Sequence, residues 1–149
     1  MSRSAPGAER LSLRLVALLA ATLVLVAGCR GGAMTAFRFE KDAESLQSLA
    51  TDGVLLADGV VDGRTTSAFV RTHAQELASD ADKLASVVAS TNPEPQLAGK
   101  TKKLAALARQ VASQLHALAD HPGDRGGAAA IRSGLANAAD DASKLEEGV

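Results

Sequence analysis

Residues 94–120, EPQLAGKTKKLAALARQVASQLHALAD, carry the clearest helical pattern in the chain. Apolar or small side chains recur there every three or four residues, which places them on one face of a helix. They are Leu97, Thr101, Leu104, Leu107, Ala108, Val111, Leu115 and Leu118. His121-Pro122-Gly123 interrupts the pattern. The stretch therefore predicts an amphipathic helix from about Glu94 to Asp120.

The same spacing predicts three more helices around this one. Turn-forming residues separate them, namely Asp62-Gly63 and Asn92-Pro93-Glu94-Pro95, because each proline disfavours helical geometry in the residue before it. The sequence contains no Trp or Tyr, and Ala and Leu dominate it, so helix formers far outnumber strand formers. The predicted helices run from about Thr35 to Val61, from a cap at Thr65, Thr66 or Ser67 to about Ser90, and from about Asp124 to Glu147. The predicted apolar stripe of the helix that ends at Ser90 is Val70, Ala74, Leu77, Ala81, Leu84 and Val88.

Four helices of about 25 residues with short connections must fold back on one another. The sequence therefore predicts an all-α fold, an antiparallel up-down-up-down four-helix bundle over residues 35–149. The helix over 124–147 has the thinnest apolar stripe, and Gly126 and Gly127 weaken its first turn. A long three-helix bundle with a loose fourth segment is the alternative.

The chain begins with a short apolar segment, Leu15 to Cys29, LVALLAATLVLVAGC, behind three arginines, Arg3, Arg10 and Arg14. As a helix, residues 15–27 would reach about 20 Å, whereas a bilayer core is roughly 30 Å thick. A positive start, a short apolar centre and small residues at its end are typical of a cleaved secretory signal. The final Val26-Ala27-Gly28-Cys29 resembles the lipobox of a bacterial lipoprotein signal peptide, and this resemblance covers residues 1–29.

The resemblance implies that Cys29 receives a diacylglyceryl group on its sulfur and that cleavage follows Gly28. Residues 1–28 would then be the signal peptide and 29–34 a short lipidated tether. The domain would be held at the cell membrane on its extracytoplasmic face, and no cofactor other than the covalent lipid is expected. The alternative is an uncleaved short anchor.

The charge and cysteine content limit the partners and the means of stabilisation. Removal of residues 1–28 takes away three Arg and one Glu, leaving 13 basic and 16 acidic residues and a formal charge of −3. This surface argues against nucleic acid, which favours a basic stripe with aromatic residues. With Cys29 lipidated, no thiol remains for a disulfide, so packing alone would stabilise the domain.

One small cluster could bind a metal. His73, Glu76 and Asp80 stand three and four residues apart, on one flank of a predicted helix, and could line up as ligands for a divalent ion. The plainer interpretation is a histidine bonded to a neighbour, with both carboxylates solvated. His116 falls on a solvent face, and His121 lies in a turn at the end of a helix.

The sequence lacks the motifs that are typical of metal-binding helical bundles and of several common enzyme classes. No histidine has a glutamate three residues before it, as di-iron bundles require. There is no Cys-x-x-Cys-His for haem, no Gly-x-Ser-x-Gly elbow and no phosphate-binding glycine loop. We therefore expect no enzymatic activity.

Two further features suggest contacts beyond the core. Leu55 and Phe37 share a direction opposite the apolar stripe of their helix, where they are either ordinary exposed residues or a contact with a partner or the bilayer. Three lysines (Lys100, Lys102, Lys103) stand where the helix dipole disfavours them. They would pair either with anionic headgroups or with the acidic end of the last helix at Asp140, Asp141, Glu146 and Glu147.

These observations predict a lipid-anchored, extracytoplasmic lipoprotein that acts as a non-enzymatic binding or structural module of the cell envelope. Its expected partners are the membrane, through the lipid, and an envelope protein that the sequence does not identify. The alternative is a small-ligand or metal-binding lipoprotein that uses the bundle interior or the flank of His73.

Overall fold

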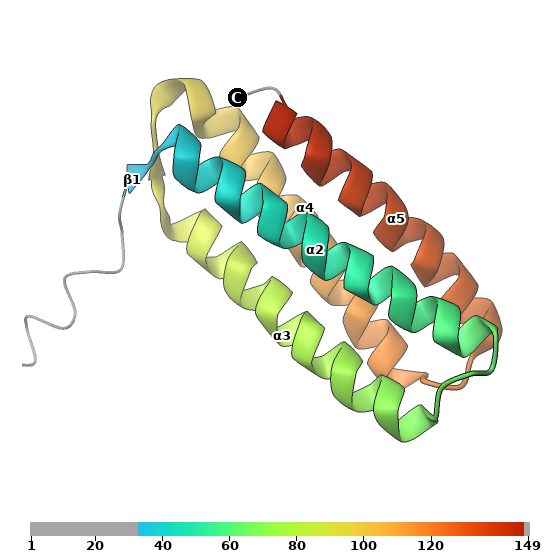
Figure 1. Cartoon of the computed structure of the whole chain (residues 1–149). Coiled ribbons are helices and arrows are strands. Elements are labelled where there is room, and N and C mark those ends of the chain that lie inside the picture. Colours follow the sequence, from blue (N-terminus) through green and yellow to red (C-terminus); the bar gives the residue numbers. More distant parts are fainter. Residues whose placement is uncertain (1–32, 148–149) are drawn as a thin grey trace, which may run out of the picture. The chain divides into compact units, whose positions relative to one another are not determined.

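Four long helices make up most of residues 33–147, the part of the chain that the computed structural model describes. They lie side by side and match the predicted ranges closely (Figure 1). The all-helical prediction is confirmed, whereas the predictions for residues 1–32 fall outside the described residues. Within 33–147, no helix combines the length and apolarity needed to cross a membrane. The helices are α2 (Ala36–Val61), α3 (Ser67–Ser90), α4 (Ala98–Asp120) and α5 (Arg125–Glu147).

Side-chain caps and one glycine explain where the first two helices begin and end. The Thr35 hydroxyl accepts a hydrogen bond from the Arg38 N–H (3.4 Å), and Thr66 does the same for the N–H of Phe69 (3.3 Å). Each bond satisfies a backbone donor that the first turn leaves free. After α2, Gly63 adopts a positive φ of 68°, which glycine accommodates without strain. Of the three predicted caps for the second helix, Thr66 is the one used.

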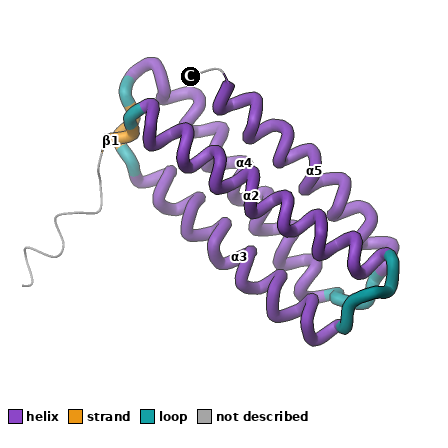
Figure 2. Tube along the Cα trace, viewed as in Figure 1, coloured by secondary structure: helices purple, strands orange, loops and turns teal. Residues whose placement is uncertain are grey.

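A short parallel pairing joins the start of the domain to the α3–α4 connection. Ala33–Met34 (β1) pairs with Asn92–Pro93 (β2), as Figure 2 shows in orange near the β1 label. Met34, predicted to belong to the tether, is fully buried, because its long apolar side chain packs into the core. The expected helix start at Glu94 is also corrected. A 3₁₀ turn, η1 (Pro95–Leu97), precedes α4.

The helices pack most extensively in two pairs, α3 against α4 and α2 against α5. In α4 the buried positions repeat every seven residues, as 101/104/105, 108/111/112 and 115/118/119, a two-turn repeat of about 3.5 residues per turn that is typical of coiled-coil packing. Many of the buried residues are alanines, whose small side chains let two helix axes approach closely. The buried residues of α4 are Thr101, Leu104, Ala105, Ala108, Val111, Ala112, Leu115, Leu118 and Ala119.

Close packing shifts the core face of α3 away from the predicted one. The prediction placed Leu77 and Leu84 in the stripe, but Ala78 and Ala85 are the buried residues and the two leucines are half-buried. Ala78 and Ala85 each contribute a methyl group to the core, and the longer leucines pack against its edge. Hydrophobic periodicity alone could not distinguish these neighbouring positions.

A glycine marks the place where three helices meet. Gly53 of α2 is buried, and a Cβ atom there would lie 2.8 Å from Leu115 Cδ2 of α4 and 2.8 Å from Leu135 Cδ1 of α5. Both leucines are fully buried. The centre of the core therefore depends on the absence of a side chain at this position.

Candidate functional site

The predicted lipidation site is not among the described residues. Gly28 and Cys29, the expected cleavage and lipid-attachment residues, precede Ala33, where the described chain begins. The four residue-to-residue steps from Cys29 to Ala33 can reach at most about 14 Å. The lipobox interpretation therefore stays a prediction, with a short connection to the domain.

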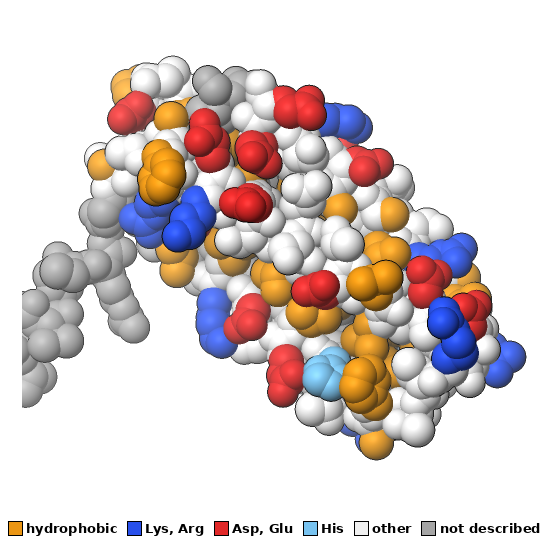
Figure 3. Space-filling view, viewed as in Figure 1, with side chains coloured by type: hydrophobic (Ala, Val, Ile, Leu, Met, Phe, Trp, Pro, Cys, Tyr) orange, Lys and Arg blue, Asp and Glu red, His pale blue; other side chains and the backbone are white. Residues whose placement is uncertain are grey.

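An apolar groove lies between α2 and α3 and has a volume of about 460 Å³. We call it the α2–α3 groove. In the face shown in Figure 3, apolar side chains gather beside a histidine and acidic residues, away from the β1 end. The groove is lined by Asp52, Leu55, Leu56, Thr65, Phe69, His73, Glu76, Leu77 and Asp80.

Its apolar surface is open to solvent at two large side chains. Leu55 is 65% exposed and Phe69 is 49% exposed. The Phe69 ring contacts that of His73, with centroids 4.2 Å apart and a tilt of 55°. An exposed cluster of apolar and aromatic residues with a polar edge is typical of a binding surface. Sequence reasoning identified Leu55 but missed Phe69, which lies next to the buried Val70.

The edge of the groove is acidic, and its polar side chains pair with neighbours on the same helix. His73 Nδ1 lies 3.2 Å from Glu76 Oε2, and Lys83 Nζ lies 2.8 Å from Asp80 Oδ1. The proposed metal ligands thus all line the groove, but Glu76 faces His73 and Asp80 faces a lysine. Among residues 33–147, no three His, Cys, Asp or Glu side chains are grouped so that they could hold a metal ion.

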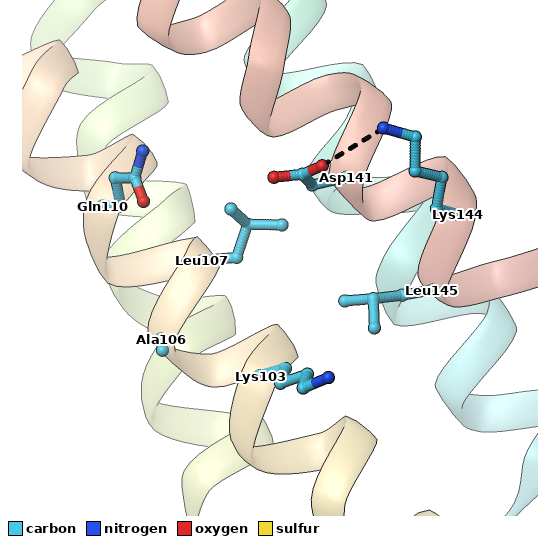
Figure 4. Close-up of a pocket in the computed structure, with 7 residues that line it drawn as sticks. All are labelled: Lys103, Ala106, Leu107, Gln110, Asp141, Lys144 and Leu145. Carbon is cyan, nitrogen blue, oxygen red and sulfur yellow. Dashed lines mark hydrogen bonds and ion pairs between the residues drawn. The ribbon is translucent and has the colours of Figure 1, made fainter.

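A second groove of about 460 Å³ lies between α4 and α5, and it bears on the predicted lysine pairing (Figure 4). Lys103 and Asp141 both line it. The Asp141 carboxylate, however, is 3.5 Å from Lys144 Nζ in its own helix. Across the described part of the chain, no ion pair within 4.0 Å joins Lys102 or Lys103 to a carboxylate of α5. Asp141, a predicted partner of the lysines, thus lines the same groove as Lys103 but pairs with Lys144 of its own helix.

Two ion pairs that the sequence did not suggest link the closely packed helices. His116 Nε2 of α4 lies 2.9 Å from Asp82 Oδ2 of α3, and Arg132 Nη1 of α5 lies 2.9 Å from Asp58 Oδ1 of α2. His116 is on the solvent side of α4, as predicted, and His121 forms the end of that helix. Their partners are far away in sequence, so only the packing of the helices reveals them.

Comparison with known protein families, curated proteins and solved structures finds no match for the chain. Its function is therefore inferred from its own residues and their geometry.

Proposed function

We propose that this protein is a lipid-anchored, extracytoplasmic lipoprotein that acts as a non-enzymatic binding module of the cell envelope. The α2–α3 groove is the observation that carries the proposal, because Leu55 and Phe69 expose large apolar surfaces beside an acidic edge. Burial of such side chains against a partner is favourable, at about 25 cal/mol per Å² of apolar surface. The anchor is supported by the lipobox-like Val26-Ala27-Gly28-Cys29.

We also infer that the four helices form an antiparallel up-down-up-down bundle. The short connections between them support this arrangement, because a helix that follows a tight turn must run back along its predecessor. The loops after α2 and α4 lie at one end of the helices, and β1 and the α3–α4 connection lie at the other (Figure 2). An exposed groove along two such rigid helices would offer a partner a preformed surface.

A binding role is favoured over an enzymatic one by how the polar side chains of the groove are engaged. His73 pairs with Glu76, and Asp80 pairs with Lys83. Among the residues that line the groove, Thr65 alone carries a hydroxyl group, and none carries a thiol. The side chain of Thr65 is itself packed against Gly59. These residues fit the charged edge of a binding surface better than the nucleophile and base of a catalytic site.

A second candidate function is the binding of a small ligand. The groove volume of about 460 Å³ falls within the roughly 300 to 1,000 Å³ common for small-molecule sites. Metal analysis and an absorption spectrum of the purified protein would test this candidate. Bound metal or a chromophore would favour it over a protein partner.

The main test places a photo-reactive amino acid in the groove of the full-length protein in its membrane. Replacement of Leu55 should give a crosslinked adduct, whereas replacement of Ser133, exposed on α5, should not. Phe69→Ser should reduce the adduct formed from position 55, since it removes apolar surface from the same groove. Failure of position 55 to crosslink in correctly folded protein would contradict a binding role for the groove.

A further inference from the structure

A line of exposed residues runs along the outer side of α2, with a large apolar side chain at each end. Phe37 is 76% exposed and Leu55 is 65% exposed. They are 18 residues apart, which is five helical turns at about 3.6 residues per turn, so they point in the same direction about 27 Å apart. Between them lie exposed polar residues, namely Lys41, Glu44, Ser45, Ser48, Thr51 and Asp52.

On its α3 side, this line carries opposite charges at its two ends. Lys41 lies beside Phe37 there, with Glu40 and Glu44 on the other side of the line, whereas Asp52 flanks Leu55 and lies across the α2–α3 groove from Glu76 and Asp80. In the face shown in Figure 3, apolar side chains near the β1 end stand beside both basic and acidic residues, and those farther along stand beside a histidine and acidic residues. An apolar site with a lysine on its α3 side and an apolar site with an acidic edge therefore lie along one face of α2.

The charges also lie on the same side of the line. At about 100° per residue, Lys41 is rotated about 40° from the Phe37–Leu55 direction and Asp52 about 60°, in the same sense. Leu56, which lines the groove, is rotated about 100° in that sense. Lys41 and Asp52 both lean toward α3.

We infer that the α2–α3 groove receives a second copy of this chain, with the two α2 helices antiparallel and face to face. The inference rests on the proposed binding role of the groove. A twofold axis beside residues 45–48 would place Phe37 of each copy over Leu55 and Phe69 of the other. The same rotation keeps both charged flanks on the α3 side. Lys41 of each copy then meets Asp52 of its partner.

The middle of this interface is suited to close approach. Ser45 and Ser48 are small and exposed, so they let two helices pack together. Glu44 lies opposite the second copy's Ser48, an uncharged residue. Such a twofold contact is isologous and closes on itself, which limits assembly to a dimer.

The interface formed by one helix face is small, so the dimer would be weak in solution. Anchoring of both copies in one membrane would favour it. Stable interfaces usually bury at least about 1,200 Å² in total, and tethering raises the effective concentration of weakly binding partners. The two β1 ends lie at opposite ends of the dimer. For both copies to be anchored in one bilayer, the twofold axis must stand along the membrane normal, with the helices along the surface.

Paired cysteines in the full-length protein test this arrangement. We expect Phe37→Cys/Leu55→Cys to form a crosslinked dimer with a short bismaleimide in membranes, because residue 37 of one copy meets residue 55 of the other. Within one copy the two sites are too far apart for the reagent. Ser48→Cys alone should also crosslink, since it lies near the axis. The matched control Phe37→Cys/Ser133→Cys should not, and neither should the wild-type protein.

A charge reversal provides a second measurement in the same cysteine background. Lys41→Glu should lower the yield of crosslinked dimer, and adding Asp52→Lys should restore it. Equal crosslinking of Phe37→Cys alone would show a parallel pairing and overturn the inference. Adducts from position 55 that contain only another protein would also overturn it while leaving the proposed binding role intact. No adduct from either experiment would contradict both.

Discussion

Asp42 is the described residue whose ionisation is most clearly coupled to folding. Its side chain is only 18% exposed, and burial raises the pKa of this carboxyl above its ordinary 3.8, although nearby Arg38 and Lys41 act in the opposite direction. One carboxylate oxygen, Oδ2, is buried without a hydrogen bond and lies 4.0 Å from Arg38 Nε. The folded state therefore binds a proton here more tightly than the unfolded chain does.

This coupling predicts a pH-dependent effect of Asp42→Asn. Because the folded-state pKa is raised, the charged carboxylate destabilises the fold as pH rises from 3.8 through the folded-state value. The variant should be more stable than wild type at pH 7, and its advantage should vanish below pH 3.8, where both side chains are neutral. Urea titrations at both pH values measure the difference. Asp140→Asn, on the exposed surface of α5, is the control and should change stability by less than about 0.5 kcal/mol.

Two glycines should respond oppositely to alanine. Gly53→Ala brings a methyl group within 2.8 Å of two buried leucines. We expect the free energy of unfolding to fall by about 1 kcal/mol, because overpacking outweighs the gain in helix propensity. Gly99 has no atom within 4 Å of the corresponding position, so Gly99→Ala should stabilise the fold by about 0.4 to 1 kcal/mol. Thermal unfolding of both variants measures the contrast. A stabilised Gly53→Ala would mean that Leu115 and Leu135 move aside freely.

Among the helices, α4 contributes buried side chains to the core along most of its length, from Thr101 to Ala119. Leu104 is fully buried, whereas Lys102, two residues earlier, is exposed. Leu104→Ala should therefore cost about 2 to 5 kcal/mol and Lys102→Ala less than about 0.5 kcal/mol. Denaturant titration of the two variants measures the difference. Similar costs at both positions would mean that the buried face of α4 is assigned wrongly.

The choice of helix neighbours depends on residues that no local pattern identifies. The pairs His116–Asp82 and Arg132–Asp58 join the same helices that pack most closely. Both pairs are partly exposed, and such pairs contribute only about 0 to 1 kcal/mol each. Each pair therefore adds little to the free energy of folding, although both link helices that pack closely. Of the residues in the predicted pairing between α4 and the end of α5, Lys103 and Asp141 line the same groove, and Asp141 also lies 3.5 Å from Lys144 of its own helix.

At the scale of the whole molecule, the proposed anchor depends on one thiol. Cys29 is the single cysteine of the chain, so Cys29→Ser should abolish lipidation and leave the unprocessed precursor. Labelling with radioactive palmitate, together with the size of the product, measures both effects. Wild type should resist a high-salt wash, since two or more acyl chains hold a protein stably at a bilayer. Label and mature size in the variant would contradict the lipobox interpretation.

The four helices of the domain and most of their ends could be predicted from the sequence alone. Apolar residues every three or four positions define a helix locally, and caps such as Thr35 and Thr66 act within three residues of themselves. Leu55 and Phe37 could be placed outside the core for the same reason, because direction around a helix follows from residue number.

The contacts between helix faces, and the groove that they form, could be identified only from the folded structure. Burial of Ala78 in preference to Leu77, the packing of Met34 and the place of Gly53 all depend on how closely another helix approaches. The α2–α3 groove likewise combines Leu55 with Phe69 from a different helix. Such contacts depend on distances between segments remote in the chain, which the local periodicity of a sequence does not specify.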